Sequence, residues 1–251
     1  MDKINLYTTL TSRQIMARKN KEEWKVFGNV FDKYTVWRLE KLASQGHYTE
    51  LKSPVSIGKE ANIFTAERED NTLIIIKIYR LESCNFNKMY DYIKYDPRYL
   101  HLKKQRRKVI FGWVQREYRN LLKARDAGVR VPTPLAINDH ILVLEMVGED
   151  KPAPQLKDLY PTNPKKFMDD IIEFMRLLWQ KAGIVHGDLS EYNILNHNDT
   201  PVFLDMSQST VKECTIAMEL LERDIKNMVN FAKKMDIKLD AEKIKKQITG
   251  K

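Results

Sequence analysis

Cysteine is scarce in this sequence: only Cys84 and Cys214 occur, and they lie far apart. Two cysteines cannot build a disulfide framework or a zinc ligand set, so a reducing cytoplasm is the setting that we expect. Glycine and proline number 9 each, which excludes a collagen-like or low-complexity chain. No apolar run approaches the roughly 20 residues of a membrane span, and the first residues lack the features of a signal peptide. We therefore expect no membrane partner.

Positive charge is in excess, with 43 Lys and Arg against 34 Asp and Glu and a net charge of +9. Such an excess favours an anionic partner, for example a nucleotide or a nucleic acid, but charge alone does not choose between them. Hydrophobic residues make up 43% of the 251 residues, which is enough to fill a sizeable core. One large domain or two lobes packed together fit this length.

The hydrophobic pattern divides the chain into three parts. Residues 1–50 predict a helical extension, because aromatic residues recur at helical spacing between residues 24 and 34. Residues 51–147 predict an N-lobe with five short β-branched strands and one helix that starts near Val109. Within this lobe, residues from about 82 to 108 are expected to form mainly a mobile loop that leads into the helix.

The last part, residues 148–251, predicts a reduced helical C-lobe. Helices are expected at about 163–180 and 215–235, with a short strand at 201–205 between them. A strand-rich half followed by a helix-rich half is an α+β pattern, and protein kinases have this bilobal order of an antiparallel sheet with one helix, then a helical lobe. Because the order of elements alone is an analogy, the residues must decide.

The segment from His186 to Asn193 reads His-Gly-Asp-Leu-Ser-Glu-Tyr-Asn, which has the H-x-D-L-x-x-x-N spacing of the protein-kinase catalytic loop. Phosphoryl transfer needs a carboxylate beside the attacking hydroxyl and an amide oxygen on the metal that holds the phosphates. We therefore expect Asp188 to be the catalytic base and Asn193 a metal ligand. The alternative is an ordinary polar loop between a helix and a strand.

Asp205 ends an apolar segment twelve residues after Asn193 (205 − 193). Protein kinases place the D-F-G acid here, and it binds Mg²⁺ at the nucleotide phosphates. Met206 and Ser207 stand in place of the Phe and Gly. Taken alone, Asp205 could simply end a strand, but in combination with Asp188 and Asn193 we expect it to bind the metal.

Lys77 ends a run of three isoleucines, similar to the V-A-I-K motif whose lysine holds the α- and β-phosphates. A lysine is costly to bury without an anionic partner. Glu117 shares a helical stripe with Trp113 and Leu121, so we expect it to face inward and to pair with Lys77. The alternatives are an edge-strand lysine whose ammonium reaches water, a surface position for Glu117, and Glu145 as a rival partner.

The segment before the second strand lies where protein kinases carry the G-x-G-x-x-G loop over the phosphates, and only Gly58 of the three glycines remains. Backbone N–H groups can still bind phosphate there, with a hydroxyl from Ser56 and a charge from Lys59. Ile63 is expected to pack on the adenine base.

The last strand of the predicted sheet leads into the connection between the lobes. Its backbone is expected to bind the adenine edge, through the C=O of Glu145 and the N–H of Val147. Met146 lies between them and points away at the period of a strand.

Three segments in combination closely resemble the RIO family of atypical protein kinases: Ser56-Ile-Gly-Lys-Glu-Ala-Asn-Ile-Phe64, the His186–Asn193 loop and Leu204-Asp-Met-Ser-Gln208. The Gly-Lys-Glu-Ala-Asn form is similar to the first branch of that family, in a compact archaeal type. The resemblance implies an ATP-dependent serine/threonine protein kinase with ATPase activity that uses Mg²⁺ or Mn²⁺. It also implies a role in maturation of the small ribosomal subunit, with autophosphorylation expected and the protein substrate unidentified.

Two mechanisms remain open for Asp205. By resemblance to the second branch of the RIO family, Asp205 is a candidate phosphoryl acceptor that forms an aspartyl-phosphate. The competing view keeps Asp205 as a metal ligand only, with Asp188 as the base for direct transfer to a hydroxyl, because a chelated carboxylate is a poor nucleophile.

Several features of ordinary protein kinases are missing. Only 46 residues follow Asp205 (251 − 205), so we expect neither a full activation segment nor a peptide-docking subdomain. Gly187 stands in place of the arginine that reads a phosphorylated activation loop, and Ser190 in place of the lysine that neutralises the transferred phosphoryl group. Asp224 resembles the acid that braces the catalytic loop in kinases, although a surface Arg-Asp pair fits its helix pattern equally well.

Two basic segments, Lys103–Lys108 and Arg13–Lys25, are candidates for RNA contacts. The alternative for both is a solvated charged face. The family resemblance favours ribosomal RNA or a precursor of the small subunit as the partner.

Two other functions are compatible with these motifs. Kinases that act on aminoglycosides or choline also carry His-Gly-Asp followed by an asparagine, but the Gly-Lys-Glu-Ala segment and the absence of an extended helical substrate domain argue against them. The other is a nucleotide-gated module that binds pre-ribosomes without catalysis, and the intact set of Lys77, Asp188, Asn193 and Asp205 argues against it.

Overall fold

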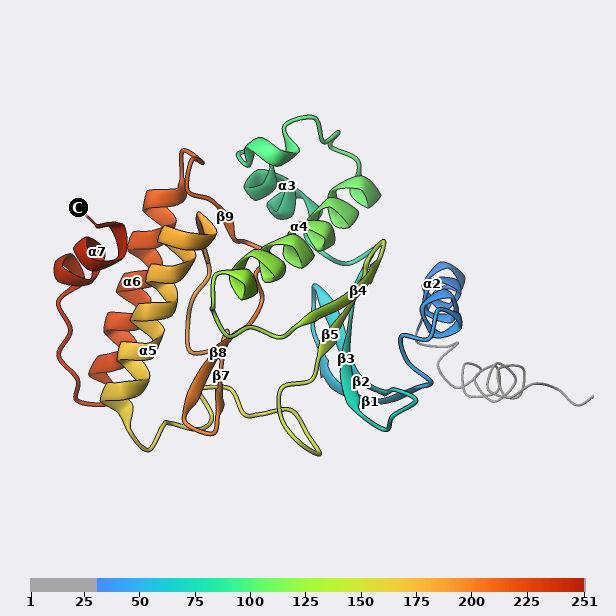
Figure 1. The fold of residues 1–251 in the computed structure, drawn as a ribbon. Helices are drawn as coiled ribbons and strands as arrows, with labels where there is room; N and C mark the ends of the chain where they lie inside the picture. Colours follow the sequence, from blue (N-terminus) through green and yellow to red (C-terminus); the bar gives the residue numbers. More distant parts are fainter. Residues whose placement is uncertain (1–30, 251) are drawn as a thin grey trace, which may run out of the picture.

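The computed structural model describes residues 31–250 (Figure 1). Trp24 and Phe27 of the aromatic repeat that predicts an N-terminal helix, and the basic segment Arg13–Lys25, lie outside these residues. Helix α2 (Lys33–Ser44) begins after Asp32, whose side chain accepts a hydrogen bond of 2.7 Å from the Thr35 backbone N–H. Leu39 and Leu42 of this helix are buried against the sheet that follows.

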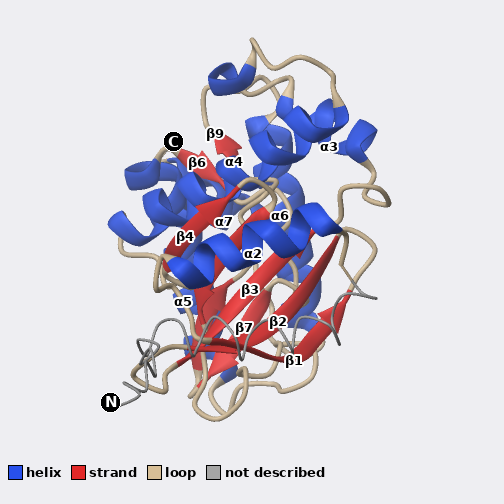
Figure 2. Cartoon of the chain, turned by 90° about the vertical axis from the view of Figure 1, so that its right-hand side faces the viewer, coloured by secondary structure: helices blue, strands red, loops and turns tan. Residues whose placement is uncertain are grey.

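Five strands form one antiparallel sheet in the order β1-β2-β3-β5-β4, which confirms the five predicted strands. Figure 2 shows α2 crossing one face of this sheet. Ile76 and Ile78 point to that face, and Lys77, which alternates with them, points to the other. The bounds are β1 (Glu50–Ile57), β2 (Ala61–Glu67), β3 (Leu73–Tyr79), β4 (Pro134–Asn138) and β5 (Ile141–Glu145).

The segment between β3 and the next long helix contains more helix than the sequence predicts. Residues 82–108 include α3 (Phe86–Ile93) and a short 3-10 helix at Pro97–Tyr99, and α4 (Arg106–Asp126) begins three residues before its predicted start. The expectation of a mainly irregular loop is therefore wrong in its secondary structure. Only two of the eight residues of α3 are buried, which is too few to reveal a helical period in the sequence.

The C-lobe is built on three helices and two small ribbons. α5 (Pro164–Leu177) continues as a π-helical turn to Ala182, and α7 (Ala241–Thr249) packs against both α5 and α6 (Ala217–Lys233). α5 and α6 confirm the expected helices, whereas α7 is not among them. None of the described helices is long and apolar enough to cross a membrane. The ribbons pair β6 (Ile184–Val185) with β9 (Thr210–Val211), and β7 (Ile194–His197) with β8 (Thr200–Phe203).

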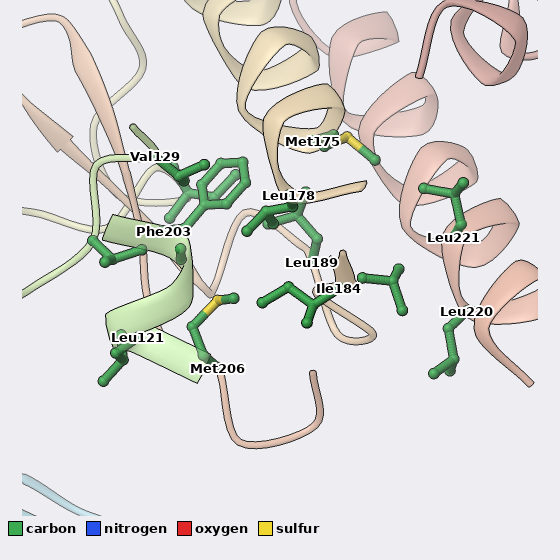
Figure 3. Close-up of a cluster of buried hydrophobic side chains, with 14 of the residues drawn as sticks. Leu121, Val129, Met175, Leu178, Ile184, Leu189, Phe203, Met206, Leu220 and Leu221 are labelled. Atoms are coloured by element: carbon green, nitrogen blue, oxygen red, sulfur yellow. The ribbon is translucent and has the colours of Figure 1, made fainter. Parts of the chain in front are cut away.

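An apolar cluster joins α4 to the C-lobe (Figure 3). Leu121 of α4 belongs to this cluster, together with Leu189 of the predicted catalytic loop. Phe203 and Met206 lie on either side of Asp205 in the sequence, and both are fully buried. The segments that carry the predicted chemistry are therefore anchored by apolar side chains, and the anchor extends across the boundary between the lobes.

Candidate active site

A cleft of about 770 Å³ is lined by residues of both lobes. Its walls come from β1, β2, β3 and α4 on one side, and from the connection after β5 and the C-lobe loops on the other. Asp188 does not line the cleft and lies beside it, next to Asn193. The predicted site residues that do line it are Ser56, Gly58, Lys59, Ile63, Lys77, Glu117, Glu145, Val147, Asn193 and Asp205.

Lys77 contacts two acids at the inner wall of the cleft. Its Nζ donates to Glu117 Oε1 at 2.7 Å and lies 3.4 Å from Asp205 Oδ1. Tyr79 donates its hydroxyl to the other Glu117 oxygen, Oε2, at 2.6 Å. Burial alone would lower the pKa of Lys77, but the charges of Asp205 and Glu117 raise it above its ordinary value. Because β3 is internal in the sheet and the ammonium is paired, the alternative of an edge-strand lysine in water is wrong.

Glu117 lies on the inner face of α4 and is 1% exposed, which excludes the surface alternative. The rival acid, Glu145, has other partners. Its carboxylate accepts from Arg130 at 2.5 and 3.0 Å and from the Thr133 N–H and hydroxyl at 2.9 and 2.7 Å. Burial would raise the pKa of Glu145, but these contacts lower it to about 2.

The backbone around the predicted adenine seat alternates as expected. Glu145 and Val147 line the cleft and Met146 does not; Met146 lines a second hollow, which Glu145 also lines. The C=O of Val147 accepts from the Ala153 N–H at 2.8 Å, whereas no backbone hydrogen bond of residues 31–250 uses the Val147 N–H. That N–H therefore has capacity for a ligand in the part of the chain that the structure describes.

Asp205 has a left-handed backbone, with φ of 52°. A non-glycine residue in this region is strained, and such strain is commonly found at functional sites. Burial in the cleft would raise the pKa of Asp205, but the Lys77 ammonium and the Ser207 contacts outweigh it, so the pKa lies below its ordinary value. The carboxylate is thus held ionised at the base of the cleft.

Asp188 is held by amide groups on neighbouring loops. Gln208 Nε2 donates to its Oδ2 at 2.8 Å, and Asn193 Nδ2 lies 3.4 Å from the same oxygen. Asn193 Nδ2 also donates to the Asp188 backbone C=O at 2.8 Å, which leaves the Asn193 amide oxygen available to a ligand. Burial and the charge of Asp205 raise the pKa of Asp188, as suits a general base.

Asp224 braces the predicted catalytic loop, which resolves the alternative that the sequence leaves open. Its two oxygens accept from the backbone N–H groups of Gly187 at 2.7 Å and Leu189 at 2.9 Å. Arg223 donates to the Gly187 C=O, and Asn227 donates to the Leu189 C=O at 3.0 Å. Burial raises the pKa of Asp224 to about 7, although both N–H donors oppose the shift.

A second set of buried polar residues is not visible in the sequence. Arg116 donates to the C=O groups of Ser209 at 3.0 Å and Gln208 at 3.2 Å, and Asn120 donates to those of Met206 at 2.9 Å and Ser209 at 2.7 Å. These residues of α4 fix the loop that follows Asp205. The sequence offers one weak signal: both lie within a turn of Glu117 on the buried side of the helix.

The segment predicted to cover the phosphates is the turn between β1 and β2, which pair at Ser56 with Ile63 and at Ile57 with Asn62. Ser56 and Lys59 are exposed, and the turn is closed by a hydrogen bond of 3.0 Å from the Gly58 N–H to the Ala61 C=O. A Cβ at Gly58 would lie 2.9 Å from that same oxygen, so a glycine is required for this close approach. Ile63 lines the cleft nearby, as predicted.

The residues at the cleft base fit a magnesium ion bound with a nucleotide. Mg²⁺ in such sites takes one or two protein oxygens and completes its shell with phosphates and water. Asn193 and Asp205 offer an amide oxygen and a carboxylate of this kind, and the Leu204 N–H joins the two segments by a 2.8 Å bond to the Asn193 C=O. Within residues 31–250, no three His, Cys, Asp or Glu side chains gather as a preformed metal cluster.

Comparison with known proteins agrees with this geometry. The sequence model of the RIO domain matches residues 62–244. The RIO-type serine/threonine-protein kinase Rio1 of Haloferax volcanii is 37% identical over 236 residues, which cover 94% of this chain and 81% of that protein. Rio1 of Methanocaldococcus jannaschii is 39% identical over 242 residues, or 95% of this chain and 83% of the relative.

Among solved structures, the Rio2 kinase–ADP/Mg²⁺–phosphoaspartate complex of Chaetomium thermophilum superposes with a TM-score of 0.65 at 19% identity. The match covers 85% of this chain and 66% of that one, and it shows a shared protein-kinase-like fold with a sheet-based lobe and a helical lobe. The fold and the site thus define an atypical kinase of two lobes. The chain belongs to the RIO kinase family.

Proposed function

We propose that this chain is an ATP-dependent serine/threonine protein kinase that also hydrolyses ATP, and that it acts in maturation of the small ribosomal subunit. The kinase part rests on one observation above all: Lys77 contacts both Glu117 and Asp205 at the wall of a cleft that Asn193 also lines. This is the arrangement that phosphoryl transfer requires, with a cation for the phosphates and oxygens for a metal.

ATP would bind with its adenine at the connection between the lobes. The Val147 N–H and the Glu145 C=O are the proposed partners of the adenine edge, and Ile63 would pack on the base. Lys77 would contact the α- and β-phosphates, with Ser56 and Lys59 covering them from above. Lys77 is already oriented by Glu117, so little of its side-chain freedom remains to be lost on binding.

Asn193 and Asp205 would hold Mg²⁺, which neutralises charge on the β- and γ-phosphates when it is bound. Asp188 would accept the proton of the attacking hydroxyl through the carboxylate oxygen that Gln208 does not engage. Ser190 supplies no cation for the transferred phosphoryl group, so we expect transfer to proteins, including autophosphorylation, to be slow.

We propose further that Asp205 accepts the phosphoryl group during ATP hydrolysis. In that step an Asp205 oxygen attacks the γ-phosphorus and ADP leaves, after which water cleaves the acyl-phosphate to inorganic phosphate. The related Rio2 structure is an ADP/Mg²⁺–phosphoaspartate complex. In this chain the Asp205 side chain is 40% exposed and opens to the cleft, which supports the proposal.

Hydroxylamine separates the two mechanisms, because it cleaves acyl-phosphates and spares phosphoserine. After incubation with γ-labelled ATP and Mg²⁺, we expect part of the protein-bound label to be released by hydroxylamine and to be absent from Asp205→Asn. Label that survives hydroxylamine completely, with none on Asp205 by mass spectrometry, would leave only transfer to hydroxyls through Asp188.

The substrate class is tested by offering alternative acceptors. We expect transfer of label to a basic protein and none to an aminoglycoside or to choline. The reverse preference would favour a small-molecule kinase. ATP binding without any turnover, at several protein concentrations and with Mg²⁺ present, would favour a nucleotide-gated binding module instead.

The ribosomal part of the proposal rests on the family and on the basic stretch before and at the start of α4. Lys103, Lys104 and Lys108 are exposed. Arg106, in contrast, donates to the C=O groups of Glu82 and Cys84 at 2.8 and 3.2 Å, so it already has a structural role. We therefore take the three lysines as the candidates for contacts with RNA phosphates.

Charge reversal tests this surface. Changing Lys103, Lys104 and Lys108 to Glu should weaken binding to small-subunit RNA, and the salt slope should fall by roughly one unit for each phosphate that is no longer bound. Basal ATP hydrolysis should stay unchanged. Lys243→Glu and Lys246→Glu on α7 are the matched control, because these lysines are exposed and remote. Equal RNA affinity in the two variants would mark the stretch as a solvated face only.

A further inference from the structure

Gln208 connects the predicted catalytic base to the N-lobe. Its side-chain Nε2 donates to Asp188 Oδ2 at 2.8 Å, while its backbone C=O accepts from Arg116 Nη2 at 3.2 Å. Arg116 lies on α4, so a single residue carries a contact from that helix to the carboxylate beside the cleft. The loop after Asp205 therefore contacts the predicted base as well as forming part of the predicted metal site.

The orientation of the Gln208 side-chain amide follows from the surroundings of its oxygen, Oε1, and its nitrogen, Nε2. Oε1 is buried and has no hydrogen-bond partner among the described residues, whereas Nε2 lies on a carboxylate oxygen. Turning the amide over would place Oε1 against Asp188 Oδ2, where two acceptors would repel. Leaving the buried Oε1 without a hydrogen bond costs free energy. The contact between Nε2 and Asp188 therefore determines the orientation of the Gln208 amide.

The backbone of Gln208 has little room to move. Asn120 holds the C=O groups of Met206 and Ser209 on either side of it, and the Ser209 hydroxyl donates to the His186 C=O at 2.9 Å. A Cβ at Gly187 would lie 3.1 Å from the Gln208 C=O, which shows how closely the two loops approach. The position of the Gln208 side chain relative to Asp188 is thus fixed by the surrounding hydrogen bonds and packing.

We propose that Gln208 is a positioning residue for Asp188: it holds Oδ2 so that the other carboxylate oxygen faces the acceptor. No hydrogen bond within residues 31–250 engages Asp188 Oδ1, which agrees with this division of roles. The inference rests on the proposed function, because it requires Asp188 to act as the base. Both a protein hydroxyl and a water molecule would approach the same free oxygen.

Loss of the Gln208 N–H removes the 2.8 Å partner of Asp188 Oδ2 and should let the carboxylate turn away from the acceptor. Because a misplaced base slows the chemical step, kcat should fall. Binding of ATP should not change, because Gln208 does not line the cleft.

The test compares Gln208→Met, which keeps the length and removes the donor, with Gln208→Glu, which places a second carboxylate beside Asp188. Gln247→Met and Gln247→Glu on exposed α7 are the matched controls. For Gln208→Met we expect kcat for ATP turnover to fall about tenfold or more, with KM for ATP within about twofold. For Gln208→Glu we expect a fall in kcat at least as large, because an ionised carboxylate has no N–H to donate to Asp188.

A double-mutant cycle with Asp188→Asn separates positioning from a general loss of structure. If Gln208 acts through Asp188, Gln208→Met causes no further loss in the Asp188→Asn background. An equal loss in both backgrounds, or a wild-type kcat in Gln208→Met, overturns the inference. Absence of turnover in the wild-type chain would instead overturn the proposed function.

Discussion

The two sides of the nucleotide cleft are built differently. Its floor, which we define as residues 186–193 and 204–210, is held by Asp224 from below and by Arg116 and Asn120 of α4 from above. Its roof, residues 55–63, is the turn between the paired strands β1 and β2, with exposed side chains at Ser56 and Lys59. Backbone bonds hold this turn, among them the Gly58 N–H to the Ala61 C=O at 3.0 Å and the Arg80 N–H to the Glu60 C=O at 2.9 Å. The floor is thus fixed by buried polar side chains, whereas the roof is held by strand pairing and backbone bonds.

This difference indicates which part of the site must be ordered before the nucleotide arrives. Catalytic groups have to be held in place in advance, because phosphoryl transfer depends on position and electrostatics. A cover over the phosphates can be ordered by the phosphates themselves. We therefore expect changes in the floor to lower kcat and stability, and changes in the roof to alter mainly the affinity for ATP.

The largest effect is expected at Asp205 in the floor. Asp205→Asn keeps the shape and the left-handed preference but removes the charge, so ATP turnover should fall by about 10² or more. The melting temperature should hardly change, since Lys77 keeps Glu117 as a partner. Asp199→Asn is the control, because Asp199 is also left-handed and lies outside the cleft. Near-wild-type turnover in Asp205→Asn would contradict the proposed site.

Arg116→Met tests whether the contacts from α4 stabilise the floor. Hydrogen bonds from a charged group contribute about 1.5–3 kcal/mol, so the free energy of unfolding should fall by an amount of this size, measured by urea titration. Arg119→Met, an exposed position on the same helix, should change it by less than about 0.5 kcal/mol. Equal stability of the two variants would mean that the floor does not depend on α4.

Asp224 gives the floor a characteristic pH dependence. Its pKa is about 7 in the folded chain, well above the ordinary value, so the folded state binds its proton more tightly than the unfolded state. Stability from this group therefore increases as pH falls through 7. Relative to Asp224→Asn, the wild type should gain about 2 kcal/mol of stability between pH 7 and pH 5. A constant difference across this range would contradict the shift.

His140, in the turn between β4 and β5, should give a pH dependence of stability with the opposite sign. Its Nε2 lies 2.9 Å from the Thr35 hydroxyl, and burial lowers its pKa to about 4. The unfolded state therefore takes up the proton first as pH falls below about 6.5. Relative to His140→Gln, the wild type should lose about 2 kcal/mol between pH 7 and pH 5. Urea titrations at both pH values check this, and a gain instead of a loss would reverse the assignment.

The smallest effect is expected in the roof itself. Ser56→Ala and Lys59→Ala each remove one exposed group above the phosphates, so KM for ATP should rise several-fold, by roughly 1 kcal/mol of binding, with kcat and the melting temperature unchanged. Lys41→Ala on α2 serves as the control, because it is exposed and far from the cleft. A fall in kcat without a change in KM would show that the roof takes part in the chemical step.

Motif spacing was sufficient to predict the residues whose chemistry depends on the nucleotide. Lys77, Glu117 and Asp205 could be placed together because their residue types and element positions are dictated by one reaction. The five strands were predictable for a similar reason, since β-branched runs between turns leave a clear pattern.

The supporting contacts could not be predicted in this way. Arg116 and its acceptor at Ser209 are 93 residues apart, and a backbone C=O carries no signature of its partner in the sequence. Of the strands in the ribbons β6–β9 and β7–β8, only β8 corresponds to a predicted strand, at 201–205, because strands of two to four residues are too short to show a clear period. For Asp224, the sequence predicted a helical position but not whether the side chain faces the interior or the solvent. That depends on the fold, which places its carboxylate beside the Gly187 and Leu189 N–H groups.

The close approach at Gly187 has a consequence for how this enzyme could be regulated. Gly187 has φ of 80°, and a side chain there would press on the Gln208 C=O at 3.1 Å and on Leu220 at 3.3 Å. The arginine that lets other kinases sense a phosphorylated activation loop would therefore strain this loop if it were introduced by one substitution. An evolutionary route to that form of control would need the loop after Asp205 to shift, and Asp188, which Gln208 contacts at 2.8 Å, would shift with it.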